Sequence, residues 1–330
     1  MQYRNMGRTG LKVSAISLGS TEFGRKLGEA ESMEIIKSAV DAGVNLIDTA
    51  DLYVEGRSEE IIGKALKGER HSVVLATKVA YRMGPGVNDI GLSRKHIMQG
   101  IEDSLRRMGT DYIDVYYAHL PDNETPIEET LRAMDDLVHQ GKVRYIACSN
   151  FRAWQLCKAL WVSELHNLTR FDCIQTPYNL ITRDIEHELL PLCFSEGIAV
   201  CVYNPLAGGL LTGKHKLNKP PVKGTRYTDE RMGPAYRERY WSATNFEAVA
   251  RLKQIAEVNG RNLAQFALAW IISNETITSV TCGTTSLKQL EENLVATEIK
   301  LSQEELEICD DVWQQIRPPR FFYGSLQVRR

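Results

Sequence analysis

The chain has 330 residues, of which 43% are hydrophobic, and its 40 basic residues nearly balance 42 acidic residues to give a formal net charge of −2. This composition allows a large buried core, and the balanced charge gives no field of one sign that would attract nucleic acid. No stretch approaches the roughly 20 consecutive apolar residues of a membrane helix, and residues 1–10 are too polar for a secretory signal core, so we expect no membrane segment and a cytoplasmic location.

Short runs typical of buried strands alternate along the chain with longer runs of helical periodicity. The expected strands cover residues 13–18, 44–47, 73–76, 112–117, 143–147, 173–174, 198–202 and 278–280. The expected helices cover residues 31–42, 58–66, 94–108, 127–139, 154–165, 184–195, 244–258, 263–273 and 287–296. Strands buried on both faces and joined by helices predict an α/β fold with eight parallel strands, a (β/α)8 barrel.

Three segments lie outside this alternation. Residues 3–13, with Gly7 and Gly10 at the turn, predict a small hairpin that closes the lower mouth of the barrel. Residues 207–241 follow the seventh strand and are expected to form a long functional loop. Residues 303–316 predict an extra helix packed outside the barrel, and the whole chain, 1–330, is expected to be one domain.

Chemistry is expected at the carboxyl ends of the barrel strands, where the loops form the catalytic face. The residues at these ends are mostly polar or aromatic: Asp48, Lys78, His119, Ser149, Asn150, Gln175, Tyr203 and Gly283, with Tyr53 shortly after Asp48. Taken singly, such an Asp is commonly an N-cap, such a Lys a solvated charge and such a His the partner of a carbonyl. Together they suggest more, because a lysine at the barrel mouth needs a carboxylate partner, which Asp48 on the neighbouring strand can supply. We therefore predict an acid/base set of Asp48, Tyr53, Lys78 and His119.

Four motifs give the chain a resemblance to the aldo-keto reductase family, and the resemblance runs nearly end to end. GVNLIDTADLYVEGRSEEIIGKAL (43–66) follows the family's first signature, and LATKVA (75–80) carries the lysine. YYAHLPD (116–122) carries the histidine, and GKVRYIACSNF (141–151) follows the second signature, with Ala147 in place of the usual glycine. The resemblance implies an NAD(P)H-dependent oxidoreductase that reduces aldehydes or ketones to alcohols.

The resemblance assigns a role to each of the four residues. Tyr53 would be the general acid that protonates the oxygen of the carbonyl while hydride from nicotinamide C4 reaches its carbon. Lys78 would make the phenol a better proton donor, and Asp48 would keep Lys78 charged and oriented. His119 would donate a hydrogen bond to the carbonyl oxygen.

The same resemblance implies a nicotinamide cofactor extended across the barrel mouth, since the sequence has neither GxGxxG after a strand nor GxxxxGK[ST]. Ser149, Asn150 and Gln175 would bind the carboxamide, and Tyr203 would stack on the ring, although ordinary polar packing explains Gln175 and Tyr203 equally well. The remaining expected cofactor contacts are Gly19, Thr21, Asp48, Asn204, Pro205, Leu206, Gly208, Leu210, Gly213, Lys214, Arg226, Gly283, Thr285, Gln289, Glu292 and Asn293.

Two departures from the family pattern bear on the choice of cofactor. Thr285 stands where many relatives have an arginine for the 2′-phosphate of NADP, and Thr281 and Cys282 replace Ile-Pro. Lys288 is a possible substitute for the arginine. We expect NADP(H), with NAD(H) also possible.

The substrate is expected to be a small-molecule carbonyl compound. Its pocket is predicted from Phe23, Tyr53, Tyr81 and His119, with Thr21, Arg82, Leu120 and the tail at 321–323 around them, although Tyr81 and the tail aromatics could equally be packing residues. The sequence does not predict the physiological substrate or the oligomeric state.

Two other functions remain open from the sequence. Some barrels of this family type associate with membrane channels, so a cofactor-binding regulatory or scaffold subunit with slow turnover is the main alternative. A metal-dependent hydrolase is less favoured, because the seven histidines are scattered, HExxH is absent and no metal site is expected. The seven cysteines lack a CxxC pair and are expected to be free thiols.

Overall fold

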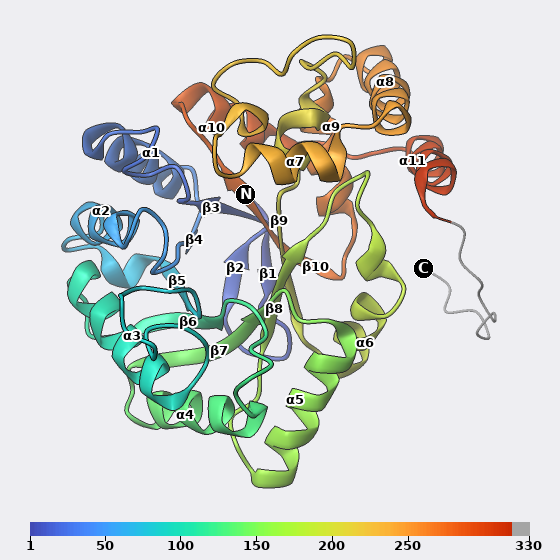
Figure 1. Ribbon diagram of the computed structural model, residues 1–330. Coiled ribbons are helices and arrows are strands. Elements are labelled where there is room, and N and C mark those ends of the chain that lie inside the picture. Colours follow the sequence, from blue (N-terminus) through green and yellow to red (C-terminus); the bar gives the residue numbers. More distant parts are fainter. Residues whose placement is uncertain (319–330) are drawn as a thin grey trace.

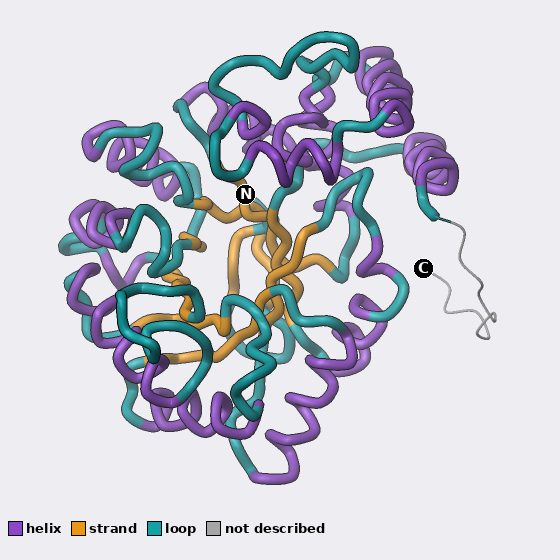
Figure 2. The backbone as a smooth tube through the Cα atoms, in the orientation of Figure 1, coloured by secondary structure: helices purple, strands orange, loops and turns teal. Residues whose placement is uncertain are grey.

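The computed structural model describes residues 1–318, which form a (β/α)8 barrel with its strands at the centre and its helices around them (Figures 1 and 2). Eight parallel strands close the barrel in the order β10-β3-β4-β5-β6-β7-β8-β9. Their bounds are β3 Ile16–Gly19, β4 Leu46–Asp48, β5 Val74–Val79, β6 Ile113–Ala118, β7 Val143–Ser149, β8 Cys173–Pro177, β9 Ala199–Tyr203 and β10 Ile277–Gly283. The predicted fold class is confirmed.

The helices surround this barrel. They are α1 Glu29–Asp41, α2 Arg57–Ala65, α3 Arg94–Met108, α4 Ile127–His139, α5 Ala153–His166, α6 Leu189–Glu196, α7 Gly233–Tyr240, α8 Ala243–Val258, α9 Leu263–Ser273, α10 Leu287–Val295 and α11 Gln303–Ile316. Helices α3, α4, α6 and α9 are among those that pack directly on the strands. The C-terminal helix α11 packs on α8 outside the barrel, as predicted (Figure 1).

The expected hairpin consists of β1 Tyr3–Asn5 and β2 Lys12–Ser14. Its Met6 and Leu11 pack against the residues that fill the barrel interior, so the hairpin closes the end of the barrel away from the strand carboxyl ends. Gly7 makes this contact possible, because a Cβ there would lie 2.4 Å from the carbonyl oxygen of Gly197. Its φ of +59° is also one that L side chains rarely adopt.

Three sequence predictions need correction. The strand expected over 13–18 is broken at Ala15. Its backbone nitrogen donates to Gln2, next to the hairpin strand β1, and its carbonyl oxygen accepts from Val280 of the barrel strand β10, so the chain passes from hairpin to barrel at this residue. The helix expected from 184 is interrupted: a short 3-10 helix covers Asp184–Glu186, and α6 begins at Leu189, because Glu188 is not helical and Pro191 lacks the N–H that would bond to the carbonyl of residue 187. The third correction is that α7 lies within the expected loop 207–241.

Helix α7 was missed because it lacks an aliphatic stripe. Its buried side chains are Tyr236 and Tyr240, whose rings contact each other. Tyr227 and Trp241 extend this aromatic cluster. Packing of the aromatic rings therefore holds a segment that looks polar and irregular in sequence.

Candidate functional site

The four predicted acid/base residues all lie at one end of the barrel. Asp48 is the last residue of β4, Lys78 lies near the end of β5, and His119 follows β6 directly. Parallel strands bring their carboxyl ends to the same rim, and the β4–α2 loop places Tyr53 above them.

A buried ion pair forms the base of this site. Lys78 Nζ lies 2.7 Å from Asp48 Oδ2 and donates a second hydrogen bond to the carbonyl oxygen of Thr49 at 2.6 Å. The side chain of Lys78 is 0% exposed and that of Asp48 is 5% exposed. Burial alone would lower the pKa of Lys78, but its interactions with Asp48 and Tyr53 outweigh burial and raise it. Lys78 is therefore a charged ammonium group at neutral pH.

Tyr53 and His119 face one another above this ammonium group. Lys78 Nζ lies 5.2 Å from the centre of the Tyr53 ring, and the rings of Tyr53 and His119 are 6.2 Å apart in an edge-to-face arrangement. Burial and the charge of Lys78 hold the pKa of His119 well below its usual range, so its imidazole is neutral. Its Nδ1 is buried and has no hydrogen-bond partner among residues 1–318. The arrangement provides a phenol beside a cation and a neutral imidazole.

The residues expected to bind the carboxamide form a hydrogen-bonded chain. Asn150 donates from Nδ2 to the carbonyl oxygen of His119 at 2.9 Å and to Ser149 Oγ at 3.1 Å, and it accepts from Tyr203 Oη at 2.7 Å. Gln175 Nε2 donates to Asp48 Oδ1 at 2.8 Å. Ser149, Asn150 and Tyr203 are thus positioned by one another, and Gln175 by Asp48.

The glycine-rich segment after β9 forms a tight turn at the same rim. Gly208, Gly209 and Gly213 have φ between +66° and +99°, and Asn204 Oδ1 accepts from the backbone nitrogen of Gly208 at 2.7 Å. The same turn contains Pro205, Leu206 and the fully buried Leu210. Partial burial and the charge of Lys26 lower the pKa of Lys214, an exposed cation.

A loop clasp ties residues 207–241 to the β3–α1 loop. Arg25 binds Asp229 at 2.7 Å, Arg226 binds Glu22 at 3.0 Å, and Lys26 donates to the carbonyl oxygen of Gly224 at 2.9 Å. The sequence analysis did not find this clasp, because its partners lie about two hundred positions apart, 204 for Arg25 and Asp229. Arg226, expected to bind phosphate, is paired with a carboxylate here.

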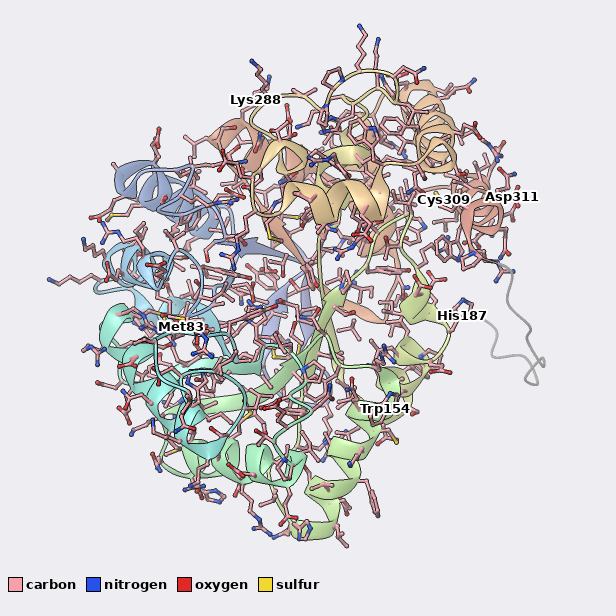
Figure 3. All side chains as sticks on the ribbon, viewed as in Figure 1. Met83, Trp154, His187, Lys288, Cys309 and Asp311 are labelled. Atoms are coloured by element: carbon pink, nitrogen blue, oxygen red, sulfur yellow. The ribbon has the colours of Figure 1, made fainter. Side chains whose placement is uncertain are left out.

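The segment after β10 leads into the N-terminus of α10. Gln289 Oε1 accepts from the backbone nitrogen and the hydroxyl of Thr285, at 2.9 and 3.0 Å. Gly283 lies beside Gly19 of β3, at the barrel rim. Asn293 is buried, whereas Glu292 is exposed and lies 3.9 Å from Lys288, which Figure 3 labels.

Of the other residues expected around the substrate, four are at least partly exposed and Phe23 is fully buried. Tyr81 is 41% exposed at the rim, and its ring lies 5.0 Å from that of His119. Thr21 and Leu120 are half-buried and Arg82 is exposed. Phe23 is fully buried in the hydrophobic core, so it presents no surface to a ligand. Residues 321–323 lie outside the described residues.

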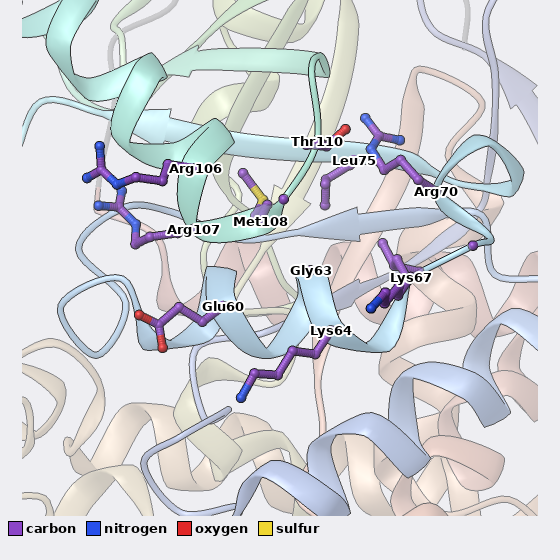
Figure 4. Close-up of a pocket in the computed structure, with 13 residues that line it drawn as sticks. Glu60, Gly63, Lys64, Lys67, Arg70, Leu75, Arg106, Arg107, Met108 and Thr110 are labelled. Carbon is purple, nitrogen blue, oxygen red and sulfur yellow. The ribbon is translucent and has the colours of Figure 1, made fainter.

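A separate surface cavity of about 560 Å³ lies between α2 and α3, away from this rim (Figure 4). Its basic side chains include Lys64, Arg70, Arg106 and Arg107. Each of these four is already paired with a carboxylate. The acid/base residues do not line this cavity.

The sequence analysis also missed two buried carboxyl groups beside the site. Glu59 is fully buried and accepts from Arg107 Nε and Thr77 Oγ1, both at 2.6 Å. Asp51 is 1% exposed, and neither carboxyl oxygen has a hydrogen-bond partner among the described residues. Burial and the charge of Glu59 raise the pKa of Asp51 to about 8.

Residues 1–318 contain no group of three or more His, Cys, Asp or Glu side chains that could hold a metal ion. None of their helices has the length and apolar character needed to cross a membrane.

Comparison with known proteins gives a consistent family assignment. The model of the Aldo/keto reductase family matches residues 15–314. A probable voltage-gated potassium channel subunit beta of Arabidopsis thaliana is 40% identical over 311 residues, covering 91% of this chain and 92% of that protein, and a probable subunit beta of Oryza sativa gives the same values. A putative voltage-gated potassium channel subunit beta of Schizosaccharomyces pombe is 37% identical over 320 residues, 94% of this chain and 92% of that protein.

Proposed function

Because the chain belongs to the aldo/keto reductase family, we propose that it reduces aldehydes or ketones to alcohols with a nicotinamide cofactor, using Tyr53 as the general acid. The observation that carries the proposal is the fully buried Lys78 ammonium, 2.7 Å from Asp48 and 5.2 Å from the Tyr53 ring. Burying a charge of this kind costs folding free energy, and a cation at this position helps Tyr53 to give up its proton. The expectation of a cytoplasmic location is part of the same proposal.

Each of the four acid/base residues has its own role in the proposed reaction. A bound reduced nicotinamide supplies the hydride for the carbonyl carbon. Tyr53 gives its proton to the oxygen of the same carbonyl, and Lys78 stabilises the phenolate that remains. Asp48 holds Lys78 in its charged form. The neutral imidazole of His119 donates a hydrogen bond to the carbonyl oxygen and orients it before the transfer.

The residues at the rim fit an extended nicotinamide cofactor. Left-handed glycines at 208, 209 and 213 form a tight turn that satisfies their own N–H groups, and Lys214 beside Gly209 supplies the cation that would bind a phosphate. Ser286 caps the N-terminus of α10, where free amides and the helix dipole also favour an anion. The Ser149, Asn150 and Gln175 side chains would hold the carboxamide, and Tyr203 would lie against the ring.

We propose NADP(H) as the preferred cofactor, with NAD(H) as the alternative. Thr285 has no charge to pair with a 2′-phosphate, but Lys288 is 84% exposed at the side chain and only loosely paired with Glu292. Comparing kcat/KM for NADPH and NADH decides between them. Lys288→Ala is expected to weaken the preference for NADPH, and an unchanged ratio would remove Lys288 from this role.

The test of the proposed reaction is NADPH oxidation over a panel of aldehydes and ketones. Tyr53→Phe is expected to lower kcat by roughly 100- to 10,000-fold, the usual contribution of a general acid, while cofactor binding stays unchanged. Tyr81→Phe is the matched control, since it removes the hydroxyl of another rim tyrosine, whose ring centre lies 5.0 Å from that of His119. No oxidation of NADPH by the parent chain with any carbonyl compound would contradict the proposal.

A second candidate function rests on the relatives. The matched proteins of Arabidopsis, rice and fission yeast are named as potassium channel beta subunits. In this alternative, the chain binds cofactor as a regulatory subunit and turns over slowly. Tight cofactor binding together with negligible turnover across the panel would favour it over the reductase.

A further inference from the structure

Helix α5 carries an exposed apolar face on the outer wall of the barrel. Trp154 is 59% exposed, Trp161 is 64% exposed and Leu165 is 63% exposed. Their spacing of seven and four residues places them on the same side of the helix. Figure 3 labels Trp154 near the start of α5, at the edge of the molecule.

Two neighbours extend this surface. Phe194, on the adjacent helix α6, is 76% exposed, and Cys157 is an exposed thiol one turn after Trp154 (Figure 1). We call Trp154, Cys157, Trp161, Leu165 and Phe194 together the α5 face.

The α5 face is distinct from the part of the helix that the fold needs. The opposite side of α5 buries Leu156, Ala159 and Val162 in the core. The other indoles are covered better, since Trp270 is 5% exposed, Trp313 is 6% exposed and Trp241 is half-buried. Two open indoles on one helix are therefore unlike the rest of the chain.

The area of the α5 face suits a protein interface. Aromatic side chains bury about 150–250 Å² each, so three aromatic residues and a leucine exposed by 59–76% present on the order of 500 Å² of apolar surface. A standard interface buries about 800 Å² on each partner, including a polar rim. The exposed apolar area of the face is therefore large enough for the centre of such an interface.

We propose that the α5 face docks a second copy of this chain, with α5 packed against α5. The face is a convex helical ridge, and helices pack by fitting ridges of one into grooves of the other. Trp161 lies between Trp154 and Leu165 on this face of α5. A two-fold rotation would bring the same face of a second copy against it, with the two Trp161 side chains near the centre.

The charges around the face agree with this partner. Lys158 and Glu164, both exposed, lie three residues to either side of Trp161 and have opposite signs. These two charges cancel within each copy, so they add no net repulsion between two copies. A membrane surface would instead favour a rim rich in Lys and Arg.

The experiment is light scattering after size-exclusion chromatography of the full chain over a range of concentrations. The parent chain is expected to self-associate, and Trp161→Glu is expected to raise the dissociation constant by roughly 100-fold or more, as for a central interface residue. Acrylamide quenching of tryptophan fluorescence gives a second readout, because association shields Trp154 and Trp161 and quenching should fall as concentration rises. If the assembly is larger than a dimer, Trp161→Glu is expected to reduce it to a smaller unit.

The matched control is Val258→Glu, the same kind of change at a residue that is 80% exposed on α8. It should leave self-association unchanged, and thermal unfolding checks that both variants are folded. A parent chain that stays monomeric at every concentration overturns the proposal. Self-association that persists unchanged in Trp161→Glu overturns it as well, because the contact would then lie elsewhere. Reductase activity plays no part in these measurements.

Discussion

Replacing Asp48 with Asn is the perturbation whose effect on stability follows most directly from the structure. Asp48 accepts from Lys78 Nζ through Oδ2 and from Gln175 Nε2 through Oδ1. Asn has nearly the same shape but no charge and only one acceptor oxygen. Lys78 would then remain fully buried without its counter-charge.

The expected loss of folding stability at pH 7 is about 3 kcal/mol. Breaking a buried pair by removing one partner costs roughly 3–5 kcal/mol, and we take the lower end because Asn keeps one acceptor for the ammonium. The matched control is Asp103→Asn, which breaks the Arg106–Asp103 pair at the same 2.7 Å separation with side chains 70% and 28% exposed. An exposed pair of this kind contributes at most about 1 kcal/mol.

The effect of Asp48→Asn should also depend on pH. In the parent chain the pKa of Lys78 is raised, so the pair stabilises the fold below the unfolded pKa and loses this contribution only as pH rises through the folded pKa. In the variant, burial is no longer opposed by Asp48 and is expected to lower the pKa of Lys78. The unfolded chain then binds more protons, so the stability of the variant rises between neutral pH and about pH 10.

Urea unfolding of parent, Asp48→Asn and Asp103→Asn at pH 7 and pH 9.5 measures these differences. The deficit of Asp48→Asn should be about 3 kcal/mol at pH 7 and smaller at pH 9.5, with little change for Asp103→Asn. A deficit below about 1 kcal/mol at pH 7, equal to that of the control, would refute the reasoning that the buried ammonium depends on Asp48.

Three further predictions concern other parts of the chain. Asp51→Asn should be more stable than the parent at pH 7.5 by at least about 1 kcal/mol. The raised pKa of Asp51, about 8, makes the parent lose stability as pH rises from about 4 to 8. A stability gain, measured by urea unfolding, that does not grow from pH 5 to pH 8 would count against this. Gly7→Ala should lower stability by roughly 2 kcal/mol or more, since the new Cβ would lie 2.4 Å from the Gly197 carbonyl oxygen and φ is +59°. The control is Gly10→Ala, whose Cβ would have nothing within 4 Å. It should change the thermal unfolding of the chain little. Arg25→Ala removes the 2.7 Å pair with Asp229 and should speed limited proteolysis of the segment 207–241, and cleavage at the parental rate would show that the clasp does not hold this segment.

The sequence predicted those parts of the site that depend on the barrel itself. Asp48, Lys78 and His119 lie at the ends of buried strands, and parallel strands bring their ends together whatever the loops do. Contacts between distant loops could not be predicted from the sequence, because no local pattern marks pairs such as Arg25 and Asp229. Their meeting depends on how whole segments fold over the rim.

Two other differences have local causes that the pattern of hydrophobic residues does not record. Phe23 follows a strand end and was expected at a substrate pocket, yet the β3–α1 loop folds it into the core. Gln175, expected to hold the carboxamide, also donates its amide nitrogen to Asp48, 127 residues earlier, a contact that no local pattern indicates. For Phe23 the direction of the side chain decides its role, and strand periodicity does not fix that direction beyond the strand end.

The central claim is that the Tyr53 hydroxyl, beside the Lys78 ammonium, is the proton donor for the carbonyl oxygen. Its most direct test is single-turnover oxidation of NADPH, followed by stopped-flow absorbance with saturating cofactor and the best aldehyde of the panel. The account predicts that Tyr53→Phe slows this step by at least roughly 100-fold without changing the NADPH dissociation constant, whereas Tyr81→Phe keeps a rate close to the parental one. A Tyr53→Phe chain that oxidises NADPH at the parental rate would contradict it.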